Sequence, residues 1–588
     1  MVLTNFPGCN GKVLMIICTL GNDRVKANDS AGAERRLVLI AFLLGALLIF
    51  GGLGRLPLMV PDEGRNAEVA REMKVSGNWL VPTYNGLPYL DKPAFYFKTV
   101  ALSLALLGDT ETAARLSSAI SGFLLLVLTY LFVRREYGNR TGALAVFVIA
   151  TSPLYLAFSR LVIFDMMLAL FVCSAIFAGS IAEQKEGRTR TKWYAIAAAA
   201  AALATLVKGP VGFIVPALVL GAYHALDRRW GALKRFFGPL NLLVFFGLTL
   251  PWFFGVNHYY PDFAYYGLVK ESLERYTTDE FRRTAPFYNM ALWVLIGLFT
   301  WTLLLPESIA AAWRNRRQLR DVDRLFIIWA VVVVAFFSFS QSKRPGYVLT
   351  AMVALGALIA RTLSNERVLR RGTALLAVVC LAGFVVFLVT KIRLRSVDAR
   401  KSELVERMSA VDCAMPAVLV VSAIAATVAW RRRDARFSTA VLVCVPLLVF
   451  AAGFKGVRMY AESKSARELS ERLPDLPAGT TFAGLRCFPT GLPFYRKQFV
   501  NVFSKDGSEL TSNYIIFMLK KTDPWPDGVV PLDERDRWLA TRRQPVFLLS
   551  SRKKTLEELR ELAAVRGATV TNLLDGWWGA LLPAPGGQ

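Results

Sequence analysis

Long apolar runs recur through most of this 588-residue chain. The first, Leu37–Leu53, contains no charged residue and would extend about 25 Å as a helix, so it can cross the hydrocarbon core of a bilayer. Hydrophobic residues make up 54% of the chain. They gather in runs of roughly 16 to 20 residues, the length of a membrane-spanning helix. We therefore predict an α-helical polytopic membrane protein.

Thirteen of these runs qualify as spans. They lie near 37–54, 116–133, 142–158, 166–182, 193–207, 211–226, 239–256, 287–305, 325–340, 346–360, 373–389, 414–430 and 437–454. Alternate connecting loops carry clusters of Lys and Arg, at 134–140, 185–190, 228–235, 314–320, 367–371 and 431–436. Since positive loops stay in the cytoplasm, we predict that these six loops and the amino terminus are cytoplasmic. An odd number of spans then places the carboxy-terminal tail outside.

Two segments complicate this topology. The loop 391–410 is predicted outside, although it has six basic residues against three acidic ones. The apolar stretch Ala94–Leu107 would invert every later loop if it crossed the membrane. We expect it to lie as an interfacial helix on the outer surface.

The chain is predicted to have three parts. Residues 1–36 form a disordered cytoplasmic extension, 37–454 the transmembrane domain with a first outer loop at 55–115, and 455–588 an outer α/β domain. In the tail, alternating patterns and Pro/Gly turns predict helices at 463–473 and 555–564, and strands at 480–485, 499–503, 514–519 and 545–550.

Composition excludes several classes of function. The net charge of +26 does not indicate nucleic-acid binding, because most basic residues stand in short clusters between apolar runs. Seven cysteines without paired spacing predict neither a disulfide framework nor a Cys-based metal site. With only two histidines, a Ser-His-Asp triad is not expected. The chemistry must therefore come from acids and cations in the outer loops.

The first outer loop holds a charged stretch from Leu58 to Lys92. A charge beside a membrane is costly, so we expect Asp62 to orient or deprotonate an acceptor hydroxyl. For Glu63 and Glu68, a functional role and a purely structural role are equally plausible; in the structural role these acids stabilise a helix start. Lys92 is expected to bind the phosphate of a lipid-linked substrate; the alternative is anchoring to lipid headgroups.

The other outer loops repeat this pattern of a cation at a turn. The candidate phosphate ligands there are Arg160, Lys208, Arg275 and Lys343. Asp165 is a second candidate carboxylate, although with Arg160 it could form a purely structural ion pair. The tyrosines between 259 and 266 could be an interfacial belt. No Gly-rich nucleotide loop is present, so the activated substrate should arrive already attached to a lipid phosphate.

Several motifs together resemble a known family. They are Asp62-Glu63-Gly64-Arg65-Asn66-Ala67-Glu68, Ser76-Gly77-Asn78-Trp79, Asp91-Lys92-Pro93, Lys208-Gly209, Glu274-Arg275-Tyr276, Ala285-Pro286-Phe287 and Lys343-Arg344-Pro345-Gly346-Tyr347. In this order they are similar to the bacterial protein O-mannosyltransferase-like glycosyltransferases with the GT-C fold. The nearest subfamily looks like the undecaprenyl-phosphate aminoarabinose transferases, which modify lipid A.

This resemblance implies residue roles. The family's first-loop acid falls on Asp62, its phosphate-binding Lys on Lys92 and its fourth-loop Arg on Arg275, while Asp165 and Tyr347 align with an acidic and an aromatic position. Together with the loop pattern, this gives Asp62 and Asp165 as candidate catalytic acids. The candidate substrate and phosphate ligands are Lys92, Arg65, Arg160, Lys208, Arg275, Lys343 and Tyr347. A divalent metal (Zn, Mg or Mn) could bind at Asp91 and Glu271, where the subfamily has a Glu and a His. Without the His, a zinc ligand set is less complete. Arg344 stands where the family usually has Leu, which suggests a more anionic sugar or acceptor.

The resemblance and the loop pattern predict an inverting glycosyltransferase. It would move 4-amino-4-deoxy-L-arabinose from undecaprenyl phosphate to lipid A, as a monomer, at the periplasmic face of the bacterial inner membrane. Transfer of another sugar, such as galacturonic acid or mannose, to lipopolysaccharide core, polysaccharide or protein is the alternative. A lipid or sugar transporter is the alternative of another class, but its charges would lie near the midplane on interrupted helices.

Overall fold

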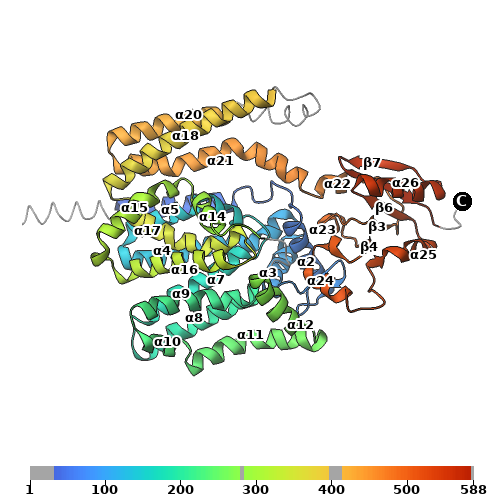
Figure 1. Cartoon of the computed structure of the whole chain (residues 1–588), viewed down its shortest axis with the longest axis horizontal. Coiled ribbons are helices and arrows are strands. Elements are labelled where there is room, and N and C mark those ends of the chain that lie inside the picture. Colours follow the sequence, from blue (N-terminus) through green and yellow to red (C-terminus); the bar gives the residue numbers. More distant parts are fainter. Residues whose placement is uncertain (1–31, 279–283, 396–413, 585–588) are drawn as a thin grey trace, which may run out of the picture.

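The structure is a computed structural model that describes residues 32–278, 284–395 and 414–584. A bundle of long helices forms one end of the molecule, and a sheet with short helices forms the other (Figure 1). Between them lie α2 (Asp62–Ser76) and α3 (Phe95–Leu107), both from the predicted first outer loop. Of the predicted extension 1–36, all but 32–36 lies outside the described residues, as does most of the loop 391–410.

Long apolar helices make up the bundle. After a helix over residues 32–50, its principal members are α4 (Glu111–Tyr137), α7 (Asp165–Ala182), α8 (Gly187–Lys208), α9 (Val211–Leu226), α10 (Trp230–Phe236), α11 (Pro239–Tyr259), α16 (Asp321–Phe339), α17 (Leu349–Thr362), α18 (Glu366–Arg395), α20 (Ala414–Arg432) and α21 (Ala435–Ser463). In the described ranges, eight helices are long and apolar enough to cross a membrane, or ten if each of two bent pairs counts as one span. The polytopic helical fold is confirmed; thirteen spans remain a prediction.

Two predicted spans are bent rather than straight. Residues 142–158 divide into α5 (Asn139–Ala150) and α6 (Pro153–Ser159), which meet at 74°. Pro153 has no N–H to continue the helix and fits the first turn of a new one. Residues 287–305 divide into α14 (Asn289–Gly297) and the segment Trp301–Arg314, which comprises η2 (Trp301–Leu304) and α15 (Leu305–Arg314), at 105°.

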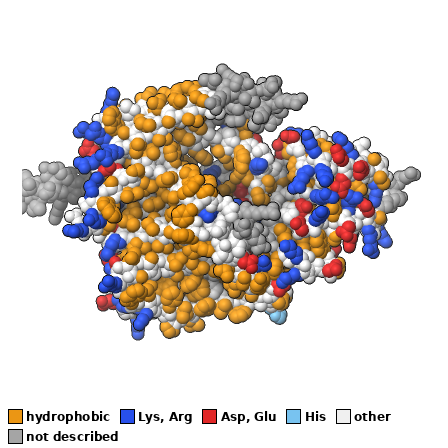
Figure 2. Space-filling view, viewed as in Figure 1, with side chains coloured by type: hydrophobic (Ala, Val, Ile, Leu, Met, Phe, Trp, Pro, Cys, Tyr) orange, Lys and Arg blue, Asp and Glu red, His pale blue; other side chains and the backbone are white. Residues whose placement is uncertain are grey.

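Lys and Arg side chains gather at the end of the bundle opposite the sheet (Figure 2). Polar contacts link the loops at that end, which are the loops predicted to share one side of the membrane. Arg135 bonds Gln184, Arg235 pairs with Glu183 at 2.7 Å, Arg324 pairs with Asp227 at 2.8 Å, and Arg320 donates to the Glu136 carbonyl. The clustering of these loops agrees with the predicted sidedness.

The helix α2 is enclosed along most of its length, from Glu63 to Met73. Its first turn carries Asp62 and Glu63, and acids there are stabilised by the helix dipole. The following helix, α3, buries one face and exposes Leu102, Leu106 and Leu107 on another. At 13 residues it is shorter than a span, and its exposed leucines agree with the predicted interfacial helix.

A six-stranded sheet follows α21. Its order is β5-β4-β3-β6-β8-β7, and its strands are β3 (Thr481–Leu485), β4 (Val500–Ser504), β5 (Val529–Pro531), β6 (Val546–Ser550), β7 (Val570–Leu574) and β8 (Trp577–Leu582). The first four are parallel, and β8 runs antiparallel to both β6 and β7. The short helices are α22 (Arg467–Glu471), α23 (Leu492–Arg496), α24 (Asn513–Leu519), α25 (Arg535–Ala540) and α26 (Lys553–Val565).

One predicted strand in this region is wrong. Residues 514–519 belong to the helix α24, whose preceding residue Ser512 accepts a hydrogen bond from the Ile515 N–H. A short apolar run does not distinguish a buried helix from a buried strand, and here the serine cap was the missed signal. The strands predicted at 480–485, 499–503 and 545–550 correspond to β3, β4 and β6.

The sheet region packs directly on the first outer loop. The Asn85 side chain donates to the Val500 carbonyl at 2.8 Å and accepts from the Val500 N–H at 2.9 Å, so it extends the backbone pairing of β4. A Cβ added at Gly64 would lie 2.8 Å from the Gly491 Cα. Only glycine lets α2 approach the 490–491 backbone this closely. The two regions therefore share one packed interface beside the predicted site.

Candidate active site

Two adjoining cavities lie where the ends of several helices meet. The polar chamber, of about 90 Å³, contains Asp62, Arg65 and Asp91 among its lining residues. The apolar chamber, of about 360 Å³, lies among α7, α8, α9, α16 and the segment 268–276. Both chambers are lined by the same seven residues, which we call the shared ring: Lys92, Asp165, Lys208, Glu271, Arg275, Gly346 and Tyr347. Sequence positions more than 250 apart thus meet at one junction.

The polar chamber places Asp62 beside two cations. Arg65 pairs with Asp62 at 2.6 Å, and Arg344 lies 3.8 Å from the other carboxylate oxygen. The side chain of Asp62 remains 35% exposed, so a substrate can reach it. Burial lowers the pKa of Arg65, but Tyr89, Asp62 and Asp91 more than offset this, and its pKa is raised. Arg65 therefore stays positively charged.

Asp165 and Lys208 form a buried ion pair in the shared ring. The Lys208 ammonium also lies 4.7 Å from the ring centre of Tyr347 and 5.0 Å from that of Phe164. A Cβ at Gly346 would meet Asp165 Oδ1 at 2.7 Å, so a glycine is needed where this turn approaches the carboxylate. Asp165 thus holds Lys208 against an aromatic wall at the junction of the chambers.

Lys92 and Arg275 converge on one carboxylate. The Lys92 ammonium donates to its neighbour's carbonyl, that of Asp91, at 2.6 Å and contacts Oε1 of Glu271. Arg275 Nη1 contacts the same oxygen. Burial lowers the pKa of Lys92. The Glu271 charge raises it in part, and the Arg275 charge lowers it further. Lys92, Glu271 and Arg275 thus form a three-membered charge cluster that borders both chambers.

The predicted metal ligands bond protein groups instead. Asp91 accepts from the Tyr266 hydroxyl at 2.7 Å and from the backbone N–H groups of Tyr514 and Asn513 at 2.7 and 3.2 Å. Glu271 pairs with Lys92 and Arg275. In the described part of the chain, no three His, Cys, Asp or Glu residues form a group that could hold a metal ion. The geometry here gives the metal prediction no support.

Two predicted phosphate ligands line neither chamber. Arg160 donates to four carbonyls at the end of the first helix, those of Leu48, Ile49, Gly51 and Gly52. Lys343 donates to the Ser340 carbonyl at 2.6 Å, and its neighbour Arg344 lines the polar chamber instead. We leave Arg160 and Lys343 out of the site proposed below.

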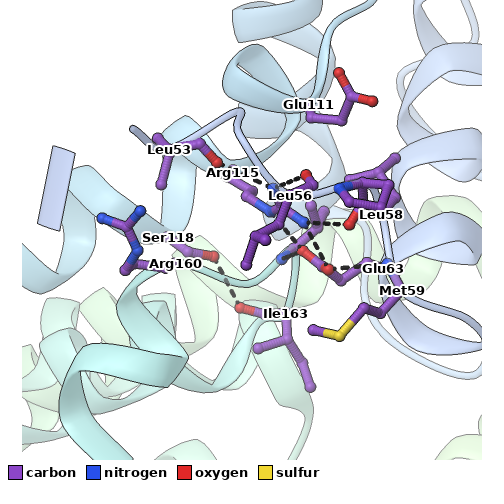
Figure 3. Close-up of polar contacts among 12 residues, drawn as sticks. Leu53, Leu56, Leu58, Met59, Glu63, Glu111, Arg115, Ser118, Arg160 and Ile163 are labelled. Carbon is purple, nitrogen blue, oxygen red and sulfur yellow. Dashed lines mark hydrogen bonds and ion pairs between the residues drawn. The ribbon is translucent and has the colours of Figure 1, made fainter. Parts of the chain in front are cut away.

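The Glu63–Arg115 pair supports the first outer loop from within (Figure 3). Arg115 Nε and Nη2 reach the two Glu63 oxygens at 2.8 and 2.9 Å, and its remaining hydrogens go to the carbonyls of Leu53, Leu56 and Pro57. Glu63 also accepts from the N–H groups of Met59 and Val162 at 3.0 Å. Of the two interpretations of Glu63, the structural one fits these contacts. Arg115 was not identified from the sequence.

The sheet region supplies one wall of the polar chamber. Thr511 and Asn513 are among its lining residues. Arg65 Nη1 donates to the Thr511 carbonyl at 2.8 Å and to its hydroxyl at 3.0 Å. No motif singled out these two residues in the sequence, and their only signal was the run of turn-forming and polar residues before α24.

Comparisons with known proteins give concordant results. Residues 91–254 match the family described as dolichyl-phosphate-mannose-protein mannosyltransferase. The undecaprenyl phosphate-alpha-4-amino-4-deoxy-L-arabinose arabinosyl transferase of Edwardsiella ictaluri is 31% identical over 309 residues, 52% of this chain and 55% of that protein. The protein of the same name from Pseudomonas savastanoi is 30% identical over 343 residues, 58% and 63% of the two chains. The chain thus spans little more than half the length of these curated relatives.

Structural similarity extends further than sequence similarity. The crystal structure of ArnT from Cupriavidus metallidurans bound to undecaprenyl phosphate superposes with a TM-score of 0.79 at 26% identity. The match covers 92% of this chain and 97% of that one. The apo form of that ArnT gives the same TM-score. The resemblance to the bacterial protein O-mannosyltransferase-like glycosyltransferases of the GT-C fold, including the aminoarabinose transferases, is therefore confirmed.

Proposed function

We propose that this protein is an inverting glycosyltransferase that moves 4-amino-4-deoxy-L-arabinose from undecaprenyl phosphate to lipid A. One observation carries the proposal. Three cations of the shared ring, Lys92, Lys208 and Arg275, lie where an apolar chamber adjoins a polar one. This order matches a lipid-linked sugar, with its isoprenoid chain on one side, its phosphate at the ring and its sugar on the other. The similar proteins support the same proposal, because one is named as a transferase of aminoarabinose from undecaprenyl phosphate and another is bound to undecaprenyl phosphate.

The cations of the shared ring would stabilise the leaving group. Transfer breaks the bond between the anomeric carbon and the phosphate oxygen, and the electron pair stays on the phosphate. Lys92, Arg275 and Lys208, whose side chains are nearly enclosed, would neutralise this growing charge. Asp165 acts through Lys208, because it fixes the position of that ammonium.

Asp62 would act on the acceptor side. Inversion requires attack from the face opposite the departing phosphate, and Asp62 lines the polar chamber without lining the apolar one. A lipid A phosphate is already ionised and needs little base catalysis. Asp62 would then orient the acceptor with Arg65, or stabilise an oxocarbenium-like transition state. A neutral hydroxyl acceptor would instead need Asp62 as its base.

A second sugar is favoured by one residue. Arg344 brings an extra guanidinium into the polar chamber, 3.8 Å from Asp62. A cation there suits an anionic sugar such as galacturonic acid or an anionic acceptor. Either transfer would take place at the periplasmic face of the inner membrane, because the basic loops that mark the cytoplasm lie at the opposite end of the bundle.

Mass spectrometry of lipid A tests the proposal. A strain without the gene should lack aminoarabinose on its lipid A phosphates, and the wild-type gene should restore it. Asp62→Asn and Lys92→Ala should each lower transfer by about 10²-fold or more, as removal of a catalytic charge does. Lys74→Ala is the matched control, since Lys74 lies on α2 but pairs with Asp109 outside both chambers.

The same spectra separate the alternatives. A galacturonic acid increment in place of aminoarabinose would support the second sugar. An unchanged set of envelope glycolipids after gene deletion would refute the glycosyltransferase assignment. Full activity of both Asp62→Asn and Lys92→Ala would refute the proposed site.

A further inference from the structure

A carboxylate already occupies the centre of the proposed phosphate site. Lys92 and Arg275, which come from different segments, both contact Oε1 of Glu271. All three side chains are nearly enclosed, with Lys92 and Glu271 8% exposed and Arg275 13%. A phosphate that bound these two cations would need the volume of this carboxylate group.

We propose that Glu271 takes the place of the phosphate in the empty enzyme and yields to the donor. The inference rests on the proposed function, since it assumes that Lys92 and Arg275 bind a lipid phosphate. It gives Glu271 a role other than metal binding: the residue sets which phosphate the site retains.

Charge balance explains why such a group is needed. Two buried cations without a counter-ion are costly, and the Lys92 and Arg275 side chains are only 8% and 13% exposed. Glu271 keeps the empty cluster charged and assembled. The shared ring then holds three cations, Lys92, Lys208 and Arg275, against two carboxylates, Asp165 and Glu271.

The same balance distinguishes donor from product. The donor phosphate is a diester with a single negative charge, whereas the departing undecaprenyl phosphate is a monoester that carries up to two. A nearby carboxylate repels the more highly charged group more strongly. Glu271 therefore weakens binding of the product more than binding of the donor, and so favours product release.

The surrounding structure allows Glu271 to move. It lies on η1 (Tyr266–Glu274), a π-helix, and this rare form is frequent at functional sites. Hydrogen bonds anchor the segment on both sides of Glu271: the Tyr266 hydroxyl donates to Asp91 at 2.7 Å, and the Tyr276 hydroxyl donates to the Phe336 carbonyl at 2.9 Å. The movement we propose is therefore one of the Glu271 side chain and not of the segment. Both chambers border Glu271, so a displaced side chain has space on either side.

Binding of undecaprenyl phosphate to the purified full-length protein tests this inference. Glu271→Gln keeps the shape of the side chain but removes its charge. We expect its affinity for undecaprenyl phosphate to rise by about tenfold or more, because a like charge next to the ligand has gone. Product inhibition should strengthen by a similar factor, while the KM for the donor falls less.

Glu274→Gln is the matched control. It removes the same charge from the same element, but Glu274 pairs with Lys270 at 3.0 Å and lines neither chamber. Its affinity for undecaprenyl phosphate should stay near that of the wild type. An equal rise in both variants would mean a general effect of negative charge and would overturn the inference.

The opposite role predicts the opposite result. If Glu271 only positions Lys92 and Arg275, Glu271→Gln will bind undecaprenyl phosphate as weakly as the wild type or more weakly. If Glu271→Gln and Glu271→Ala both fail to fold, Glu271 is a structural anchor and the inference is also wrong. The proposed function itself would be refuted if the wild type did not bind undecaprenyl phosphate, or if Lys92→Ala left that binding unchanged.

Discussion

Two buried acids, Glu63 in the first outer loop and Glu271 on η1, show how differently an ion pair can be used. Glu63 meets Arg115 through both oxygens, and backbone groups take up the remaining bonds of each (Figure 3). Glu271 meets two cations through one oxygen, and it borders two cavities. The first arrangement leaves no place for a ligand. The second is a charge cluster that a phosphate can enter, which is why we assign structure to Glu63 and function to Glu271.

The substitution with the largest expected effect removes the Glu63–Arg115 ion pair. Arg115→Met should lower the free energy of unfolding by about 3–5 kcal/mol, because it leaves the buried Glu63 carboxylate without its cation. Thermal unfolding of the detergent-solubilised protein measures the loss. Arg55→Met is the control, since Arg55 is exposed on the same loop. Normal stability of Arg115→Met with impaired transfer would show that Glu63 has the functional role and would reverse the comparison.

The sequence predicted most of the charged residues of the site but not the groups that support them. Asp62, Lys92 and Arg275 stood out because charge at a membrane surface needs a reason. The groups that support neighbouring residues of the first outer loop are remote in sequence: Arg115 lies 52 positions from Glu63, and Thr511 lies 446 from Arg65. Hydrophobic periodicity identifies helices, but it does not specify which loops meet. The contacts of Asp91 with α24 therefore emerged only from the fold.

Helix bends and the role of a cation at a helix end were also not predictable from the sequence. The apolar pattern at 142–158 is continuous across Pro153, although the chain bends there by 74°. Arg160 looked like a phosphate ligand because it sits at an outer helix end, yet four carbonyls of the first helix bind its guanidinium. The carboxyl-terminal end of a helix also attracts cations, so a cation at a turn has two explanations that sequence alone does not separate.

A smaller effect concerns the pH dependence of phosphate binding. Burial lowers the pKa of Lys92 from its usual 10.5, and the Glu271 charge works against that change. On the proposed function, binding of undecaprenyl phosphate needs the protonated amine, so it should be lost as the pH rises through this lowered pKa. Glu271→Gln removes the raising influence, and its alkaline loss should begin at lower pH.

Titration of undecaprenyl phosphate affinity from neutral to alkaline pH measures this shift. Neighbouring Arg275 and Asp91 also act on the pKa of Lys92, in opposite directions, and neither is changed in this experiment. Lys92→Arg is the control, because its guanidinium stays charged throughout the range. If Glu271→Gln loses affinity at the same alkaline pH as the wild type, the Glu271 charge does not act on the pKa of Lys92. The functional difference between Glu271 and Glu63 would then be weaker.

The smallest effect tests how the sheet region contributes to the site. Thr511→Val removes the hydroxyl that accepts from Arg65 at 3.0 Å but keeps the carbonyl that accepts at 2.8 Å. Loss of one such bond is worth about 0.5–1.5 kcal/mol, so transfer should fall by only about two- to tenfold, while Thr511→Ser should stay close to wild type. Lipid A modification rates and unfolding temperatures distinguish these outcomes. A loss as large as that of Lys92→Ala would mean that Thr511 touches the substrate itself, and the sheet region would then join Glu271 on the functional side of the comparison.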